Sequence, residues 1–217
     1  EGEELQHPWL NKSIETAQKR VEQHHFSIRK RTLEYDDVMN KQREAIYARR
    51  AAILEGTDLR DQAIELVGTM VEGLVRAYAD EKLGHGEWNL RGLSMEIASI
   101  LNVRSGPDLE AREFHSWTEL HEAVLTIFMR AYEQKEAAVG AERMRELERA
   151  IMLYLIDSKW VDHLQAMDML RDGIGLRAYG QLDPLVEYKR ESYMMFNDLL
   201  RSIGEDFVRY VFRVRIR

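Results

Sequence analysis

The feature that most constrains this chain is a run of 45 residues, Asn11–Glu55, that contains neither glycine nor proline. Glycine and proline are the residues that most often interrupt a helix, so their absence favours one continuous helix. Apolar side chains recur in the run at spacings of three, four or seven residues: Ile14, Ala17, Val21, Ile28, Tyr35, Val38, Ile46 and Ile53. This period is typical of an amphipathic α-helix. At 1.5 Å per residue we predict a helix about 67 Å long.

A helix of that length cannot be enclosed by the rest of this chain. A compact domain of 217 residues has a radius of gyration of only about 17 Å. The apolar stripe is also interrupted by His24, Arg31 and Gln42, which a self-contained coiled coil tolerates poorly. We therefore expect an elongated molecule whose long helix contacts several partners, some of them outside this chain.

The region 56–140 predicts a small, separate helical subdomain. Gly56 is well placed to end the long helix. Further helices are expected at 57–83, near 93–102 and from Ser116 to about Val139. The last of these begins with a capping box, in which Ser116 and Glu119 each bind a free backbone donor.

The region 141–217 predicts an antiparallel helical hairpin. Residues 141–172 form the most apolar helix, and Asp183 with Pro184 is a typical start for a final one. The glycine-rich run Gly173–Pro184 lies between them as the hairpin tip. The predicted fold is therefore all-α and elongated, with a helix of ~45 residues packed against a two-helix hairpin and a small helical wing inserted between them.

Composition and net charge argue against several classes of function. The chain is 45% hydrophobic and 32% charged, which is typical of a globular protein, and its longest apolar stretch is too short to span a membrane. There is no cysteine and no secretory signal pattern, so a reducing, cytosolic setting is expected. A formal charge of −7 argues against a dedicated nucleic-acid binder.

The sequence contains no recognisable nucleotide-binding, metal-binding or catalytic motif. The only Lys-Ser pair, Lys12-Ser13, has no glycine-rich turn before it, so ATP binding by a P-loop is not expected. The histidines do not converge at metal-ligand spacing, and no metal site is predicted. Acidic residues within the helices are expected to be ion-paired or solvated rather than catalytic.

Two segments carry interaction signals. Between Lys19 and Arg50 there are nine basic and five acidic residues, which can be a partner surface or a solvated face with i,i+4 ion pairs. On the glycine-rich tip, Tyr179 and Arg177 can contact a passing chain without requiring a particular sequence. The alternative is that Tyr179 folds back and packs the loop.

Three blocks of sequence resemble the C-terminal helical part of the SecA family, the ATP-driven motors of bacterial protein secretion. The blocks are Phe26–Asn40 with Gln42-Arg43 and Ile46-Tyr47; Val139–Glu142 with Ile156–Trp160 and His163–Asp168; and Gly173–Pro184 with Glu187–Ser192. Their order matches the family, and the resemblance covers essentially the whole chain, being weakest in the wing from 56 to 138.

The resemblance implies three regions: 1–55 the long scaffold helix, 56–140 the helical wing, and 141–217 the two-helix finger with the end of the scaffold. In the family the finger regulates ATP hydrolysis, and its tip contacts the translocating polypeptide at the SecYEG channel. The implied tip residues are Leu176, Arg177, Ala178, Tyr179, Gly180 and Gln181. The implied motor-interface candidates are Arg29, Lys30, Arg31, Asp36, Asp37 and Arg43.

The resemblance also implies what lies outside this chain. The family's nucleotide-binding folds, its preprotein cross-linking domain and its zinc-binding tail have no counterpart here, so no cofactor and no enzymatic activity are expected of this chain alone. ATP and magnesium would bind the motor domains of a larger parent, which is cytoplasmic and peripheral at the inner face of the plasma membrane.

The expected partners are those motor domains, the SecYEG channel and unfolded preprotein, with an anionic membrane surface as a further candidate. Leu182 stands where the family commonly has a lysine, which weakens a charge-based contact of the tip with lipid. Two alternatives remain: a stand-alone helical adaptor that binds a partner helix without catalysis, and a hydrolase built from clustered carboxylates and histidines.

Overall fold

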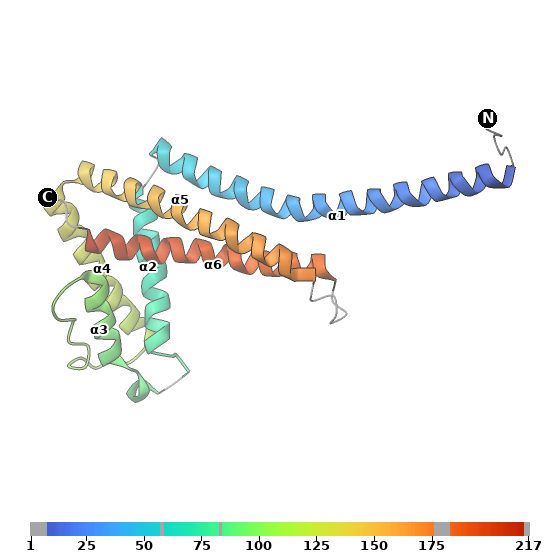
Figure 1. Ribbon diagram of the computed structural model, residues 1–217. Helices are drawn as coiled ribbons and strands as arrows, with labels where there is room; N and C mark the ends of the chain where they lie inside the picture. The colour runs from blue at the N-terminus through green and yellow to red at the C-terminus, as the bar shows by residue number, and fades with distance from the viewer. Residues whose placement is uncertain (1–7, 57–58, 83, 176–182, 215–217) are drawn as a thin grey trace. The chain divides into compact units, whose positions relative to one another are not determined.

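In a computed structural model of the chain, every regular element is helical (Figure 1). The structure describes residues 8–56, 59–82, 84–175 and 183–214. Its elements are α1 (Pro8–Glu55), α2 (Leu59–Tyr78), a short 3₁₀ turn η1 (His85–Glu87), α3 (Leu90–Leu101), α4 (Trp117–Val139), α5 (Ala141–Ile174) and α6 (Pro184–Arg213). The predicted all-α class is confirmed, and no strand occurs in these ranges.

The long helix α1 is continuous over 48 residues, three more than the predicted run. It begins at Pro8, a residue tolerated at the start of a helix because its missing N–H would have no partner there. It ends before Gly56, whose φ of 79° lies in the left-handed region. This backbone angle favours glycine, whereas a Cβ there would meet only the flexible end of the Arg149 side chain, at 3.0 Å.

The chain divides into two compact units. The first contains α1 up to Ala45, α5 from Ala166 and α6 up to Met194. The second contains the remainder, including the whole of α2, α3 and α4. Helices α1, α5 and α6 therefore each contribute residues to both units.

In the second unit, α2 packs against both α3 and α4 (Figure 1). Leu120, Val124 and Phe128 of α4 are completely buried. The end of α6 joins this core: the Phe212 ring lies 5.8 Å from that of Phe128, and Arg209 pairs with Glu96 of α3 at 2.9 Å. The helices of the wing thus share one core with the last turns of α6.

Two boundaries in the wing differ from prediction, and Asn89 forms a hydrogen bond at each of them, one through its side chain and one through its backbone. Helix α3 begins at Leu90 instead of near 93, since the Asn89 side chain accepts a hydrogen bond from the Gly92 N–H at 2.8 Å. Helix α2 ends at Tyr78 instead of 83, where the Tyr78 carbonyl accepts from the Asn89 N–H at 2.9 Å. One residue, Asn89, therefore fixes both ends.

The apolar period of the last helix, which runs through Ile203 and Phe207, predicts that Tyr210 is buried, and the apolar block Ile151–Ile156 predicts the same for Tyr154. Both predictions are wrong. Tyr210 of α6 is 43% exposed, and the neighbouring Val208 and Val211 are buried in its place. An α-helix has 3.6 residues per turn, so residues chosen at spacings of four or seven drift slowly around a long helix. By Tyr210 this drift has moved the predicted stripe off the buried face. On α5, Tyr154 is 61% exposed although the apolar block around it predicts burial on every side.

Candidate interaction surface

The first half of α1 is uncovered. Every side chain from Trp9 to Leu33 is exposed, whereas burial begins with Glu34 and reaches 1% exposure at Ile46. We call residues 9–33 the uncovered segment. Its large apolar side chains, each at least 45% exposed, are Trp9, Leu10, Ile14, Val21, Phe26, Ile28 and Leu33.

The apolar residues of the uncovered segment lie on more than one side of the helix. Leu10, Ile14 and Val21 follow one stripe at spacings of four and seven residues. Phe26 and Leu33 are also seven residues apart, and at 100° per residue Phe26 lies nearly opposite Ile28. A helix with apolar residues on several sides is typically buried by more than one neighbour.

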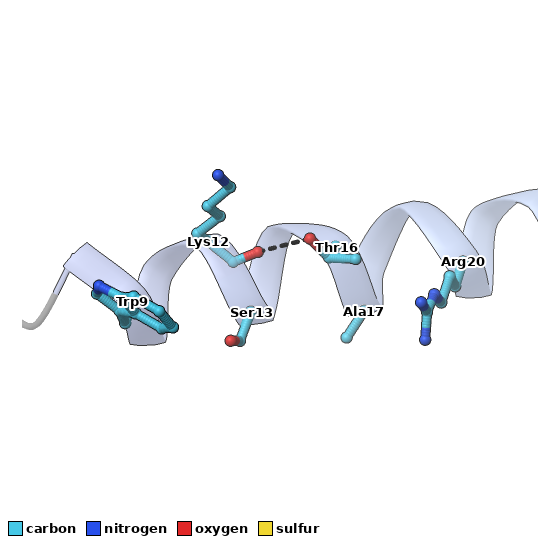
Figure 2. A pocket seen from close by; sticks show the side chains of 6 residues that line it. All are labelled: Trp9, Lys12, Ser13, Thr16, Ala17 and Arg20. Atoms are coloured by element: carbon cyan, nitrogen blue, oxygen red, sulfur yellow. Dashed lines mark hydrogen bonds between the residues drawn. The ribbon is translucent and has the colours of Figure 1, made fainter.

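A shallow pocket lies along the start of the uncovered segment (Figure 2). Trp9, Ser13, Ala17 and Arg20 project from one side of the helix, and Lys12 points the other way. The Thr16 hydroxyl donates to the Lys12 carbonyl at 2.8 Å, so it is satisfied within the helix. The small Ser13 and Ala17 leave the helix backbone open to close approach from outside.

The predicted basic triplet Arg29, Lys30 and Arg31 lies in the uncovered segment, and all three side chains are exposed. None of the three forms an ion pair with a described residue, whereas Lys19 nearby pairs with Glu15 at 2.8 Å. The triplet is therefore not neutralised by i,i+4 pairs along its own helix.

The other motor-interface candidates lie just beyond the uncovered segment. Asp36 is half-buried, and its carboxylate lies 3.9 Å from Arg171 of α5. Asp37 pairs with Lys41 at 2.7 Å, and Arg43 donates to the Asn40 side chain at 3.4 Å. The structure thus brings Asp36 to the hairpin and leaves Asp37 and Arg43 in local contacts.

The second half of α1 packs on the hairpin within the first unit. The rings of Tyr35 and Tyr188 lie 4.7 Å apart, and Tyr188 is 1% exposed. Burial raises the pKa of the Tyr188 hydroxyl above its ordinary value. Gln42 donates from Nε2 to the Ser192 carbonyl at 3.0 Å. Aromatic and polar contacts therefore both hold α1 against α6.

The predicted tip residues Leu176, Arg177, Ala178, Tyr179, Gly180 and Gln181 lie outside the described residues. On either side of the tip, Ile174 is buried, and the Asp183 side chain accepts from the Leu185 N–H at 2.8 Å as the predicted N-cap.

Sequence reasoning missed a buried polar cluster at the end of α4. Tyr132 donates to Glu148 of α5 at 2.6 Å, and Arg145 contacts the same carboxylate at 2.7 Å and Glu136 at 2.8 Å. Burial raises the pKa of both Tyr132 and Glu148. The signal in the sequence is Glu148 itself, a charged residue in the apolar stripe formed by Met144, Ile151 and Leu155.

Among the described residues, no group of three or more histidines and carboxylates is placed to hold a metal ion. No helix in the described ranges combines the length and apolar character required to cross a membrane.

An all-helical fold, a long helix with an uncovered first half, and a hairpin packed on its second half define the class of a scaffold protein. Comparison with known families supports this class directly. The family model described as the SecA wing and scaffold domain matches residues 4–215. The chain belongs to the SecA wing and scaffold domain family.

Relatives agree along the whole chain. A protein translocase subunit SecA from Pelotomaculum thermopropionicum is 50% identical over 98% of this chain and 24% of its own length. The corresponding subunit of Desulforudis audaxviator is 48% identical over 98% of the chain and 24% of its own length. The protein translocase subunit SecA 1 of Clostridioides difficile is 45% identical over 98% of this chain and 23% of its own length. The chain spans about a quarter of the length of these curated relatives.

Proposed function

We propose that this chain is the mechanical scaffold of a SecA-type protein translocase. In this proposal α1 binds the nucleotide-binding motor domains of the parent protein, and the hairpin of α5 and α6 carries their movement to a translocating polypeptide. The main support is the uncovered segment, where apolar residues on several sides of the helix are exposed over residues 9–33. Relatives four times as long provide the neighbours that such a helix requires.

The charges of the uncovered segment suit the same role. Arg29, Lys30 and Arg31 form no ion pair with a described residue, so their charges remain available to acidic groups on a partner. Asp36, Asp37 and Arg43 continue the proposed interface toward the hairpin. Because α1 is one helix from Pro8 to Glu55, a displacement along its axis at one end reaches the part that contacts the hairpin.

Binding to the motor domains can be measured directly. The purified chain is mixed with a fragment of a SecA relative that holds its nucleotide-binding part, and the dissociation constant is determined by calorimetry. Phe26→Glu places a charge in the uncovered segment and should abolish binding. Met95→Glu, at a 63% exposed position on α3, is the matched control and should bind normally. If the unmodified chain does not associate, the alternative of a stand-alone helical adaptor is favoured.

The finger tip is the second part of the proposal. By family resemblance, Leu176 to Gln181 contact the polypeptide at the mouth of the SecYEG channel, with Tyr179 as the main contact. In a complete translocase, Tyr179→Ala should depress translocation and leave basal ATP hydrolysis nearly intact. An undiminished translocation rate would remove the tip from the mechanism.

The remaining elements of the proposal follow from the parent. ATP and magnesium bind its motor domains, and unfolded preprotein is its substrate. It works on the cytoplasmic side of the plasma membrane as a peripheral protein, where an anionic lipid surface is a further partner. Regulation of ATP hydrolysis by the finger belongs to the same proposal and is measured by comparing ATPase rates with and without this chain.

A further inference from the structure

Gln42 is a buried polar residue in an apolar stripe. It follows Tyr35 and Val38 and precedes Ile46 on the side of α1 that packs on the hairpin, and it is 7% exposed. Its Nε2 donates to the main-chain carbonyl of Ser192 at 3.0 Å, across 150 residues of sequence. The amide therefore contacts the backbone of α6 and not merely another side chain.

Ser192 is suited to receive this bond. It is completely buried, and its own hydroxyl donates to the Tyr188 carbonyl one turn earlier at 2.5 Å. A hydroxyl that bonds back to its own helix does not compete for the Gln42 amide. The short side chain also leaves the Ser192 carbonyl within reach of α1.

Apolar packing alone would leave the position of α6 along α1 weakly defined. The stripe on α1 repeats every three or four residues, so a shift of one turn brings another apolar residue to the same place. The ion pair between Asp36 and Arg171 is long, at 3.9 Å, and half-exposed, so it adds little resistance to such a shift. After a one-turn shift, however, the Gln42 amide would be buried away from the Ser192 carbonyl.

We propose that Gln42 and Ser192 form an axial register lock, which fixes the hairpin at one position along α1. A polar residue at one buried position of a coiled coil specifies register in the same way. The lock stands on the contacts of the first unit alone. Its consequence for translocation rests on the function proposed above, because only then does the position of the hairpin set the position of the tip.

Removing the amide should release the register without loosening the packing. Gln42→Leu and Gln42→Met keep a side chain of similar size and make the stripe continuously apolar. We expect a thermal unfolding midpoint equal to or above that of the unmodified chain. We also expect the hairpin to occupy additional positions, displaced along α1 by one turn of about 5.4 Å.

The distance between the two helices can be measured in the full chain. It contains no cysteine, so Glu44→Cys and Lys189→Cys introduce a unique pair of spin-label sites at exposed positions on α1 and α6. Double electron–electron resonance should give one narrow distance distribution without further changes. Adding Gln42→Leu should broaden or split it, and adding Gln18→Leu, at an exposed position of the same helix, should not.

Ser192→Ala separates the two groups of Ser192, because it removes the hydroxyl and keeps the carbonyl. The distribution should stay narrow in this variant. A broadening equal to that of the Gln42 variants would overturn the proposed lock, since the hydroxyl would then set the register. A narrow, unshifted distribution in both Gln42→Leu and Gln42→Met would overturn it as well.

A second measurement separates the lock from the proposed function. In a complete translocase, Gln42→Leu should lower the translocation achieved per ATP hydrolysed. If the distance distribution broadens while translocation is unaffected, the lock is supported and the proposed role of the hairpin fails. If the distribution does not change, the lock fails whatever the translocation rate.

Discussion

The hydroxyl of Tyr132 lies 2.6 Å from Oε1 of Glu148, and both side chains are closed to solvent, at 1% and 0% exposure. This contact joins α4 to α5 around Gly140, the single residue between the two helices. Arg145 donates to the Tyr132 oxygen at 2.7 Å, so the three groups form one network. A buried carboxylate is tolerated only when it is paired in this way.

Tyr132→Phe keeps the ring but removes both the hydrogen bond to that carboxylate and the oxygen that accepts from Arg145. We expect the free energy of unfolding to fall by about 1.5–3 kcal/mol, the range for a hydrogen bond to a charged group. Urea unfolding followed by circular dichroism measures the change. Tyr154→Phe, at a 61% exposed position on α5, is the matched control and should have almost no effect. Equal effects of the two substitutions would show that the buried bond is not stabilising.

Lys135 holds the end of α6. Its Nζ donates to the carbonyls of Val211 and Val214, the latter at 2.6 Å, and burial lowers the pKa of its ammonium group. Lys135→Met keeps the length of the side chain and removes the charge and the donor. The Val211 carbonyl in the last turn of α6 and the Val214 carbonyl just after the helix then lose this partner, so the final turn should fray and its amide protons should exchange faster.

Hydrogen exchange followed by mass spectrometry can resolve this turn. Lys12→Met, at an exposed position on α1, is the control for loss of a lysine. Unchanged protection of residues 208–214 in Lys135→Met would contradict the assigned role.

Gly106 provides a close backbone approach in the wing. A Cβ at this position would lie 2.0 Å from the Ser94 carbonyl oxygen of α3, a main-chain atom that cannot move without the helix. We expect Gly106→Ala to lower the free energy of unfolding by about 1–3 kcal/mol, the usual cost of overpacking.

Gly73→Ala is the matched control for Gly106→Ala. A Cβ at Gly73 on α2 meets nothing within 4 Å, and this substitution should stabilise the chain by about 0.5–1 kcal/mol. Thermal unfolding of both variants gives the comparison, and a destabilised Gly73→Ala would mean that α2 has an unrecognised contact there.

His163 should make stability depend on pH. Its ring lies 5.4 Å from that of Trp160 and 5.9 Å from that of Phe196, and burial lowers its pKa below the ordinary 6.5. Below 6.5 the unfolded chain therefore binds a proton at this residue that the folded chain does not. The free energy of unfolding should fall as the pH drops, by at most about 1.4 kcal/mol per pH unit.

The effect can be isolated by unfolding His163→Gln in urea between about pH 7.5 and about pH 5.5. This variant should lose part of the pH dependence, while His25→Gln, at an exposed position, should retain it. Parallel curves for the unmodified chain and His163→Gln would contradict the prediction.

Helix existence and most helix ends could be predicted because their causes are local. Ser116 accepts from the Glu119 N–H at 3.1 Å, and the Asp183 cap is formed as well. The carboxylate of Glu119 binds the N–H of His115 in place of that of Ser116, a small departure from the expected capping box. The contacts that end or cap the helices at Gly56, Ser116 and Asp183 join residues only a few positions apart, so they can be predicted from the local sequence.

Burial depends on packing between distant segments, and here sequence reasoning was less successful. Ile14 and Ile53 both lie on the apolar stripe of α1, yet Ile14 is 48% exposed and Ile53 is 1% exposed. Neither value follows from local sequence, because each depends on which helix lies opposite. The partner of Gln42 could not be predicted either. The position of Gln42 in an apolar stripe indicated that it was unusual, but its partner Ser192 lies 150 residues away in the sequence.

The central claim is that α1 acts as one stiff element between a motor and the hairpin. Lys30→Pro interrupts the helix within the uncovered segment, at a cost of about 3 kcal/mol for a proline in a helix interior. Lys30→Ala removes the same charge and keeps the helix, so the pair separates stiffness from charge. Both are introduced into a complete SecA translocase, and translocation and ATP hydrolysis are measured together.

We predict that Lys30→Pro loses most of its translocation per ATP hydrolysed, while Lys30→Ala retains it. Equal translocation per ATP in the two variants would contradict the account, because a broken α1 would then transmit movement as well as a continuous one.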